Sequence, residues 1–427
     1  MREDLLHFIW KYKKLLGQDL ITVDGESIII KDFGRHNQLA GPDFFNAQIK
    51  IAGQLWAGNV EMHLRSSDWY AHHHETDEKY NTVILHVVWE DDARIFRTDN
   101  TKVPTLQLKD YIPQSLLDSY SELFSKKRTS FLNCGGNIKE FDDFKFKNWL
   151  ERLYFERLET RSVLIEQLLK EHNHDWEQVL FLLLMRSFGT KINGEAFFEI
   201  GKAIPFPIIR KLNNDAVVLE SVLMGIAGFL EDDSILDDHY LTLKKEYNYL
   251  TVKHSLAGST LLKPDFFKLR PHNFPTIRLS QIAALYGSQE HLFSKLMEAK
   301  TINEIYNVFK VAASPYWTTH FTFGKESKKQ VKKLSNSFVD LIIVNALLPL
   351  KFCYDRSKGK LDSTNIMDLA TAMRPEENSV ISNFQDLGVS CDSGMEGQGL
   401  LQLYNFFCTK NKCLQCPVGI SILGRNN

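Results

Sequence analysis

The sequence contains little cysteine for its length, with six cysteines among 427 residues. So few thiols cannot hold a chain of this size together in the manner of a small disulfide scaffold. We therefore expect the cysteines to be thiols or metal ligands in a reducing compartment.

A long uninterrupted apolar run is also missing. Asp4, His7 and Lys11 interrupt the amino-terminal stretch, which therefore lacks the apolar core of a signal peptide. Apolar segments such as residues 179–185 are far shorter than the roughly 20 residues that a membrane-spanning helix needs. These absences predict a cytoplasmic protein with no membrane partner.

Charge of one sign is not in excess, because the formal net charge is −2. This balance excludes a histone-like protein covered in positive charge but leaves room for a local basic groove. Basic residues gather at 125–128 and 325–333, and Lys268 and Arg270 lie beside aromatic residues, a mixture that suits phosphate contact and base stacking. Such runs are also typical of solvated helix faces. DNA or RNA is the partner that we expect.

The apolar pattern changes along the chain and predicts an α+β protein. After a helix over residues 3–16, apolar residues recur with a period of two, which is typical of strands. The predicted strands are residues 27–31, 45–51, 55–64 and 82–89, with an edge strand at 102–108. Beyond residue 143 the spacing is helical almost throughout. We therefore expect a small mixed sheet with a leading helix in residues 1–112, a connector at 113–142, and a large all-helical domain at 143–427.

Two carboxylates and a histidine are predicted to meet at the open end of a hairpin. If Ile51 pairs with Leu55 across the turn, the strand period places Asp43, Glu61 and His63 on one face. Such a group forms an oxygen-rich site for Mg²⁺ or Mn²⁺, and the ion can activate water and neutralise a phosphodiester. The alternative is that Asp43 caps a turn, Glu61 is solvated and His63 is an ordinary strand residue.

More histidines follow this hairpin. His72 and His74 lie two residues apart and either bind a transition metal or belong to a solvated loop. His86 lies in a strand that is apolar on both faces, so we expect it to be hydrogen-bonded in the core or functional. Asp68 and Asp77 are expected to cap local turns or to hydrogen-bond metal-binding histidines.

Cysteines crowd near the carboxyl end, at Cys391, Cys408, Cys413 and Cys416. The last three have a C-x4-C-x2-C spacing, and the glycine, proline and lysine residues around them suit thiolates that bind Zn²⁺ or a [4Fe-4S] cluster. The alternative is a set of unligated small residues. We expect a structural role, because no G-x-G-x-x-G, Walker or G-x-S-x-G motif accompanies the thiols.

The hairpin resembles the PD-(D/E)XK nuclease superfamily. The resemblance rests on Pro42-Asp43, the hairpin that follows, and Glu61-Met62-His63. It implies a restriction-endonuclease-like domain in which Asp43 and Glu61 bind the metal and His63 takes the place of the lysine that assists the attacking water. Two features depart from the superfamily: histidine replaces lysine, and residues 66–81 offer only a short polar helix.

Most of the chain also resembles a bacterial family known only as a domain of unknown function. That family implies a single full-length unit but no activity. The motifs that carry the resemblance are GPDF (41–44), WAGNVEMH (56–63), SDWYAHHH (67–74), VILHVV (83–88), RPHNFPTIRL (270–279) and CLQC (413–416).

Three functions fit these observations. The first is a metal-dependent nuclease that hydrolyses nucleic-acid phosphodiesters at Asp43, Glu61 and His63. The second is an inactive nucleic-acid or protein-binding module, which the lysine-to-histidine change favours. The third is a transition-metal hydrolase of small molecules that uses the histidines.

Overall fold

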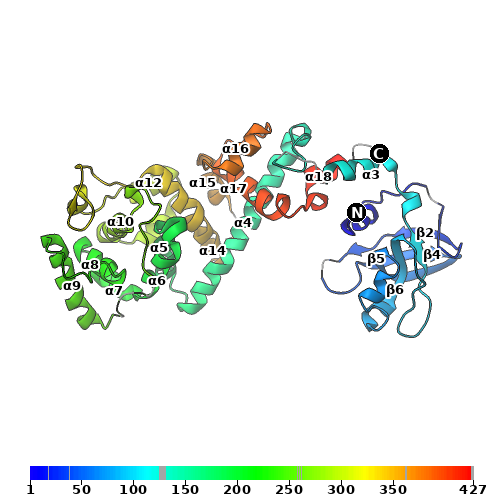
Figure 1. The fold of residues 1–427 in the computed structure, drawn as a ribbon, viewed down its shortest axis with the longest axis horizontal. Helices are drawn as coiled ribbons and strands as arrows, with labels where there is room; N and C mark the ends of the chain where they lie inside the picture. The colour runs from blue at the N-terminus through cyan, green and yellow to red at the C-terminus, as the bar shows by residue number, and fades with distance from the viewer. Residues whose placement is uncertain are drawn as a thin grey trace. The chain divides into compact units, whose positions relative to one another are not determined.

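The computed structural model describes residues 1–427 except 18, 38, 125–130, 257, 259, 261, 361–362 and 425–427. The chain forms two compact units (Figure 1). Unit 1 contains Met1–Phe146 and Tyr404–Asn427, and unit 2 contains Lys147–Leu403. The end of the chain thus returns to the unit that holds the sheet, whereas its helical spacing alone had grouped it with residues 143–427.

Unit 1 is built on a mixed seven-stranded sheet. Its strands lie in the order β1-β2-β4-β5-β6-β7, and β3 pairs with β4. The pairs from β1 to β5 are antiparallel, whereas β5–β6 and β6–β7 are parallel. The α+β class expected from the sequence is therefore confirmed. The strands are β1 Leu20–Ile21, β2 Ser27–Asp32, β3 Arg35–His36, β4 Phe44–Ile51, β5 Gln54–Arg65, β6 Val83–Glu90 and β7 Thr105–Gln107.

The leading helix, α1 (Asp4–Lys11), packs against this sheet. Leu5, Leu6 and Ile9 are fully buried in the same core as the apolar residues of β4, β5 and β6. The helix is shorter than the predicted residues 3–16, because Lys13 adopts a left-handed backbone with φ of 55°.

The turn between β4 and β5 contains two residues. Ala52 and Gly53 both have a left-handed backbone, with φ of 47° and 86°, as a type I′ hairpin turn requires. Ile51 therefore pairs with Gln54 and not with Leu55. The register predicted from a longer turn was wrong by one residue at this end.

A bulge changes the register again toward the open end of the hairpin. Asn46 has φ of 59°, and Phe44 pairs with Val60. The turn and the bulge each shift the pairing by one residue from the predicted register. Together they shift it by two residues, so Asp43 lies opposite Glu61 on the face that the sequence predicted.

The segment between β5 and β6 covers the sheet face opposite α1. It contains the helix α2 (Asp68–Ala71) and the 3₁₀ turn η1 (Glu78–Thr82). Trp69 is fully buried, with its ring 5.4 Å from that of His86. On β6 the neighbouring Leu85 belongs to the α1 core, so His86 points to the other face. This short connection joins two parallel strands and carries the histidine run.

Gly58 on β5 is required by the close approach of β6. A Cβ atom at this position would lie 2.4 Å from Cγ2 of Ile84 and 2.6 Å from the carbonyl oxygen of Thr82. We expect Gly58→Ala to lower the free energy of unfolding by about 1–3 kcal/mol, as overpacked cores do. Urea unfolding followed by tryptophan fluorescence measures this loss. Gly136→Ala is the control, since its Cβ would meet no atom within 4 Å, and equal losses in both variants would contradict the prediction.

The carboxyl-terminal segment completes unit 1. Leu414 and Leu423 lie in the α1 core, and α18 packs against α3. The region predicted as a connector thus contains a helix with its own packing partner. The remaining elements of unit 1 are η2 Lys109–Tyr111, α3 Gln114–Leu123, η3 Ile138–Glu140, the π-helical turn η7 Tyr404–Cys408, η8 Cys413–Gln415 and α18 Pro417–Gly424.

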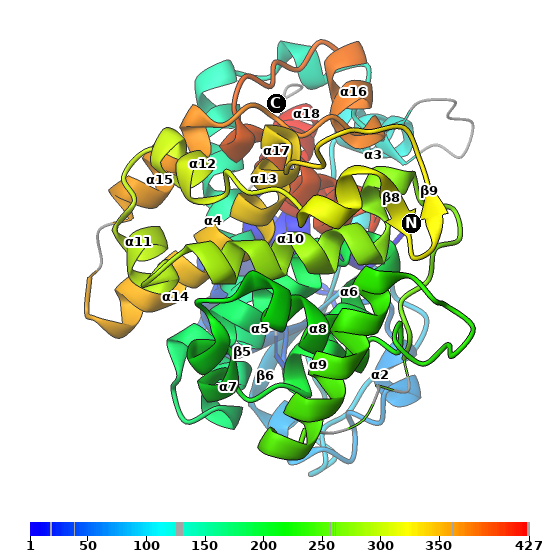
Figure 2. The ribbon, with the colours of Figure 1, turned by 90° about the vertical axis from the view of Figure 1, so that its left-hand side faces the viewer.

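The described residues of unit 2 form helices, turns and connecting loops, apart from a short hairpin of β8 (His320–Thr322) and β9 (Lys325–Glu326). In it α5 packs on α6, and α10 packs on both α5 and α8 (Figure 2). Its helices are α4 Asp143–Glu171, which begins in unit 1, α5 Trp176–Phe188, α6 Thr190–Lys202, α7 Phe206–Leu212, α8 Ala216–Ile226, α9 Asp238–His254, α10 Pro275–Ser288, α11 Leu292–Glu298, α12 Ile302–Val308, α13 Asn336–Ile342, α14 Leu348–Ser357, α15 Thr364–Ala372, α16 Ser379–Asp386 and α17 Gly394–Leu403. The short turns are η4 Pro271–Asn273, η5 Pro315–Thr318 and the π-helical η6 Ile343–Leu347, and the strands are β8 His320–Thr322 and β9 Lys325–Glu326.

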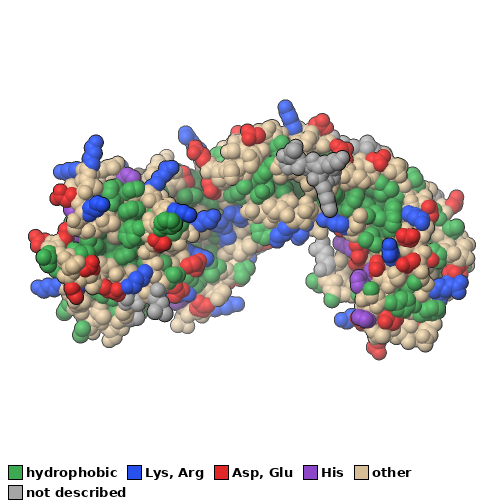
Figure 3. Space-filling model, viewed as in Figure 1, with side chains coloured by type: hydrophobic (Ala, Val, Ile, Leu, Met, Phe, Trp, Pro, Cys, Tyr) green, Lys and Arg blue, Asp and Glu red, His purple; other side chains and the backbone are tan. Residues whose placement is uncertain are grey.

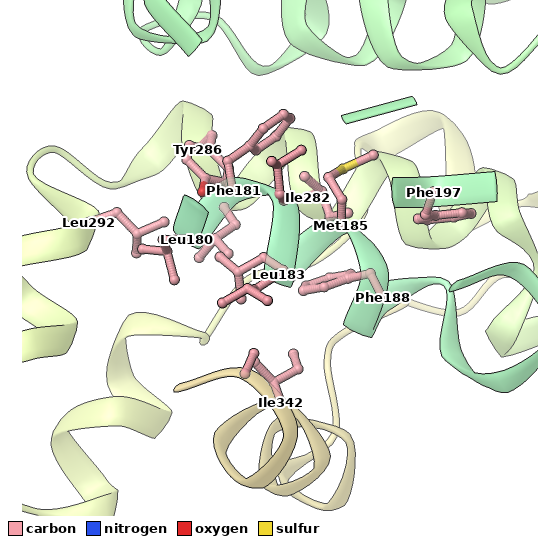
Figure 4. Packing of buried hydrophobic residues seen from close by; sticks show 14 of the residues in the cluster. Leu180, Phe181, Leu183, Met185, Phe188, Phe197, Ile282, Tyr286, Leu292 and Ile342 are labelled. Carbon is pink, nitrogen blue, oxygen red and sulfur yellow. The ribbon is translucent and has the colours of Figure 1, made fainter. Parts of the chain in front are cut away.

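The helix α5 forms the centre of the unit 2 core. Its side chains pack toward Tyr286 and Ile282 of α10 and toward Ile342 of α13 (Figure 4). The helical stretch Asn336–Ser357 is long and apolar enough to cross a membrane by composition, but 61% of its apolar window is buried inside the protein. Such burial is typical of a core helix.

Candidate metal centre

Neighbouring strands bring the predicted site residues together. Glu61 and His63 alternate on β5 with residues of the α1 core, so both point to the opposite face. On the parallel strand β6, His86 pairs directly with Glu61. The space-filling view shows histidines gathered on one face of unit 1 (Figure 3).

The connection after β5 brings two more histidines to this face. His72 ends α2, and His73 has a left-handed φ of 61°, which turns the chain so that His74 points back to the sheet. The amide of His74 donates to the carbonyl oxygen of Trp69 at 3.0 Å, and its ring stacks on that of Tyr80 with 3.6 Å between centroids. Asp77 caps η1 by accepting the N–H of Lys79, whereas Asp68 accepts the N–H of Arg65 at the end of β5.

The imidazoles of His63, His72 and His74 form a compact group. One ring nitrogen from each lies within 4.8 Å of the others. His63 Nε2 is 3.0 Å from His72 Nδ1, and His74 Nε2 is 3.3 Å from Glu61 Oε1. Tetrahedral ligands about 2.1 Å from a metal stand about 3.4 Å apart. The spacing of these nitrogens therefore fits a shared transition-metal ion.

His86 lies behind this group. Its Nε2 is 2.8 Å from His63 Nδ1, which leaves His63 Nε2 to face His72 and Glu61. The His86 ring is fully buried, and its Nδ1 has no hydrogen-bond partner among the described residues. His86 thus orients His63 rather than joining the compact group.

The acidic side of the site forms a second group. Glu3, His7 and Asp43 each place a ligand atom within 4.8 Å of the others. His7 Nε2 lies 3.2 Å from Asp43 Oδ2 and 3.8 Å from Glu3 Oε1. Glu3 and His7 were missed as site residues, although their spacing of four places them on one helical face. Only the packing of α1 on the sheet brings them to Asp43.

Backbone hydrogen bonds hold the two carboxylates in place. The amide of Asp43 donates to Glu61 Oε2 at 3.1 Å, and the amide of Met62 donates to Asp43 Oδ2 at 3.0 Å. Glu61 Oε1 instead faces the imidazoles, 3.6 Å from His63 Nε2. Glu61 therefore stands between the acidic group and the imidazole group.

Burial sets the protonation states of the site. Burial and the charge of Asp43 raise the pKa of Glu61 to about 9. Burial and the neighbouring His74 lower the pKa of His63 to about 3, and burial lowers the pKa of His86 well below its usual value. At neutral pH without a cation, Glu61 thus carries a proton and the two histidines are neutral. Neutral imidazoles are the form that binds metals.

The cysteines group differently from the expectation. Cys134, Cys408, Cys413 and Cys416 line one cavity in unit 1. Cys391, which its place in the sequence groups with the last three, belongs to unit 2, where its thiol lies 3.9 Å from the carbonyl oxygen of Ser393. Cys391 therefore does not line this cavity, because the chain returns to unit 1 only at Tyr404.

The expected basic surfaces are found in part. Lys268 and Arg270 are exposed, and Lys268 Nζ lies 5.0 Å from the centroid of the exposed Phe267 ring. In the run at 325–333, Lys332 is buried and bonds to backbone carbonyls, so that run is not wholly a solvated face. The run at 125–128 lies outside the described residues.

Comparison with known proteins gives one match. A family model described as "Protein of unknown function (DUF2851)" matches residues 3–379. No curated protein and no solved structure matches the chain. The matched range includes the acidic and imidazole groups and ends before Cys408.

Proposed function

We propose that this chain, which belongs to the DUF2851 family of proteins of unknown function, is a metal-dependent hydrolase of nucleic-acid phosphodiesters. The observation that carries the proposal is the position of Glu61. Its Oε1 lies 3.3 Å from His74 Nε2, and its Oε2 accepts the Asp43 amide hydrogen at 3.1 Å. A carboxylate between two groups of ligand atoms suits a pair of cations, an arrangement common in phosphodiester hydrolysis.

The residues fit divalent cations on chemical grounds. Oxygen donors of Glu3 and Asp43 suit Mg²⁺ or Mn²⁺, whereas the imidazoles of His72 and His74, with Oε1 of Glu61 beside them, suit Zn²⁺ or another transition metal. A bound cation there would neutralise phosphate charge and lower the pKa of a bound water. The proton on the buried Glu61 supports this fit, since a cation would replace it as the compensating charge.

His63 is proposed to position the attacking water. Its ring is held by His86 through Nδ1, at 2.8 Å, and its Nε2 points toward Glu61 Oε1. Because its pKa is lowered to about 3, the ring is neutral at pH 7 and suits a hydrogen bond that orients the water rather than the role of the base that takes its proton. This is the role that the PD-(D/E)XK superfamily assigns to lysine, and a restriction-endonuclease-like sheet is part of the proposal.

The choice of nucleic acid as substrate depends on two features. The pair of carboxylates beside a water-positioning group resembles the nuclease superfamily in its residues and their order. In unit 2, the exposed Lys268, Arg270 and Phe267 combine positive charge with an aromatic face, which suits single-stranded nucleic acid.

The test is cleavage of single-stranded and duplex DNA and RNA with Mg²⁺, Mn²⁺, Co²⁺ or Zn²⁺. We expect native protein to cut at least one of them and Glu61→Gln to lose more than about 100-fold in rate, since even residues that only support metal ligands cost 10- to 100-fold. His73→Asn is the matched control, because His73 is exposed and asparagine tolerates its left-handed backbone. Absence of cleavage with every metal, in folded protein that still binds nucleic acid, would favour the inactive binding module.

A second candidate is a transition-metal hydrolase of small molecules. The compact group of His63, His72 and His74 favours it, because three imidazoles are typical of catalytic zinc sites. The metal requirement separates the two functions. Hydrolysis of small esters or phosphodiesters with Zn²⁺ or Co²⁺, without action on DNA or RNA, would support the second candidate over the first.

A further inference from the structure

A second set of metal-type ligands lies in unit 1. Cys134, Cys408, Cys413 and Cys416 line one small cavity together with Asn133, Phe407 and Gly419. The cavity has a volume of about 20 Å³, and a single water needs roughly 10–15 Å³ on this scale. Apart from Asn133, the side chains that line it are thiols and an aromatic ring.

Two backbone turns fold the segment that carries the three carboxyl-terminal thiols into one loop. The amide of Asn411, whose φ is 52°, donates to the carbonyl oxygen of Cys408 at 3.1 Å. The amide of Cys416 donates to the carbonyl oxygen of Cys413 at 3.2 Å. These two turns bring the C-x4-C-x2-C spacing around a common point.

Gly419 allows α18 to lie directly against this loop. A Cβ atom at Gly419 would stand 2.1 Å from the carbonyl oxygen of Cys413 and 3.1 Å from its Cβ. Asn133 adds a bond from the other side, since its Nδ2 donates to Asn411 Oδ1 at 2.9 Å and lies 3.6 Å from Cys413 Sγ. The residue before Cys134 thus ties the two distant parts of the chain together at the thiols.

The surroundings are those of a soft-metal site rather than of redox or catalytic thiols. All six cysteines of the protein are thiols and not disulfides. Thiolates are the ligands of structural zinc and of iron–sulfur clusters, and four cysteines around one small cavity match the number of protein ligands that either centre takes.

We infer that Cys134, Cys408, Cys413 and Cys416 bind a thiolate-coordinated metal centre, either a zinc ion or an iron–sulfur cluster. This ligand set takes Cys134 from the amino-terminal part of unit 1 and excludes Cys391. The centre closes the long loop between residues 134 and 408 and fastens the carboxyl-terminal segment to the sheet. Its position beside Leu414, which packs in the α1 core, gives it a structural role.

The test begins with full-length protein purified without oxygen. In protein with Glu61 and His72 both replaced, we expect about one zinc ion, or about four iron atoms with acid-labile sulfide, per chain, and visible absorption separates the cluster from zinc. Cys134→Ser is expected to lower the retained metal by at least about tenfold, whereas Cys391→Ser is expected to keep it. Hydrogen exchange of residues 404–424 should rise when the metal is removed.

Two outcomes would overturn the inference. One is a native protein that holds neither metal after anaerobic purification and reconstitution. The other is loss of metal in Cys391→Ser with full retention in Cys134→Ser. If Cys134→Ser does not fold, X-ray absorption at the zinc or iron edge decides, measured on protein in which Glu61 and His72 are both replaced, because only cysteine sulfur should then appear as protein ligand. A nitrogen or oxygen ligand from the protein would contradict the four-thiolate set.

Discussion

Replacement of Glu61 by glutamine is expected to weaken the binding of two divalent cations at once. The two carboxylate oxygens of Glu61 face different partners, His74 at 3.3 Å and the Asp43 amide at 3.1 Å. Glutamine keeps the shape but removes the negative charge and replaces one acceptor oxygen with an NH₂ donor. We expect the affinity at both positions to fall by more than about 100-fold. Calorimetric titration of metal-depleted protein with Mn²⁺ and with Zn²⁺ measures both affinities.

Variants of single groups give the controls for this prediction. Glu3→Gln should weaken only the position beside Asp43, and His72→Asn should weaken only the imidazole position. His73→Asn should change neither. A Glu61→Gln protein that still binds one cation with native affinity would show that Glu61 serves a single position. Metal bound by the cysteines is measured separately, as the metal content of a variant in which Glu61 and His72 are both replaced.

The second large effect is a dependence of cation binding on pH. The pKa of Glu61 is raised from 4.5 to about 9 in the folded protein. Between these values the folded state keeps a proton that the unfolded state has lost, so stability without a cation falls as pH rises through this range. His63 has the opposite sign, since its pKa is lowered from 6.5 to about 3 and stability rises with pH in that range. Above pH 6.5 the contribution of His63 no longer changes with pH. The contribution of Glu61 then dominates, so the free energy of unfolding without a cation falls as the pH rises toward 9.

A cation that displaces the Glu61 proton changes this balance. Its apparent affinity should rise by about tenfold per pH unit from 6.5 toward 9, because one proton is released for each binding event. Titrations at several pH values, in buffers of different ionisation enthalpy, measure both the affinity and the proton release. Glu61→Gln should flatten the dependence. A native affinity that is the same at pH 6.5 and 8.5 would contradict the displacement of a proton from Glu61.

The β4–β5 hairpin shows which features of the site follow from the local sequence and which follow from packing. The alternation of apolar and polar residues predicts both strands and the face that Asp43 and Glu61 share. The register was wrong at the turn, because a left-handed Ala52 cannot be inferred from its type, and the bulge at Asn46 then restored the face. Side chains of a strand alternate between its two faces. A register shift of two residues therefore keeps each side chain on its face, whereas a shift of one residue moves it to the other face.

The histidines show a different limit. His86 was expected to be either hydrogen-bonded in the core or functional, and the structure makes it a hydrogen-bond partner of His63. Whether His72 and His74 lay in a solvated loop depended on where the connection folds. The burial of Trp69 and the left-handed backbone of His73 direct the segment onto the sheet, where His74 is buried while His72 stays exposed beside His63.

The sequence by itself determined the α+β class, the leading helix, the strands that carry the carboxylates, and the grouping of three thiols by their spacing. These properties follow from side-chain periodicity and turn chemistry over a few residues. Tertiary structure alone decided that α1 brings Glu3 and His7 to Asp43, and that Cys134 rather than Cys391 joins the carboxyl-terminal thiols. Such contacts join residues far apart in the chain, and they are selected by the burial of a common core, which no local pattern encodes.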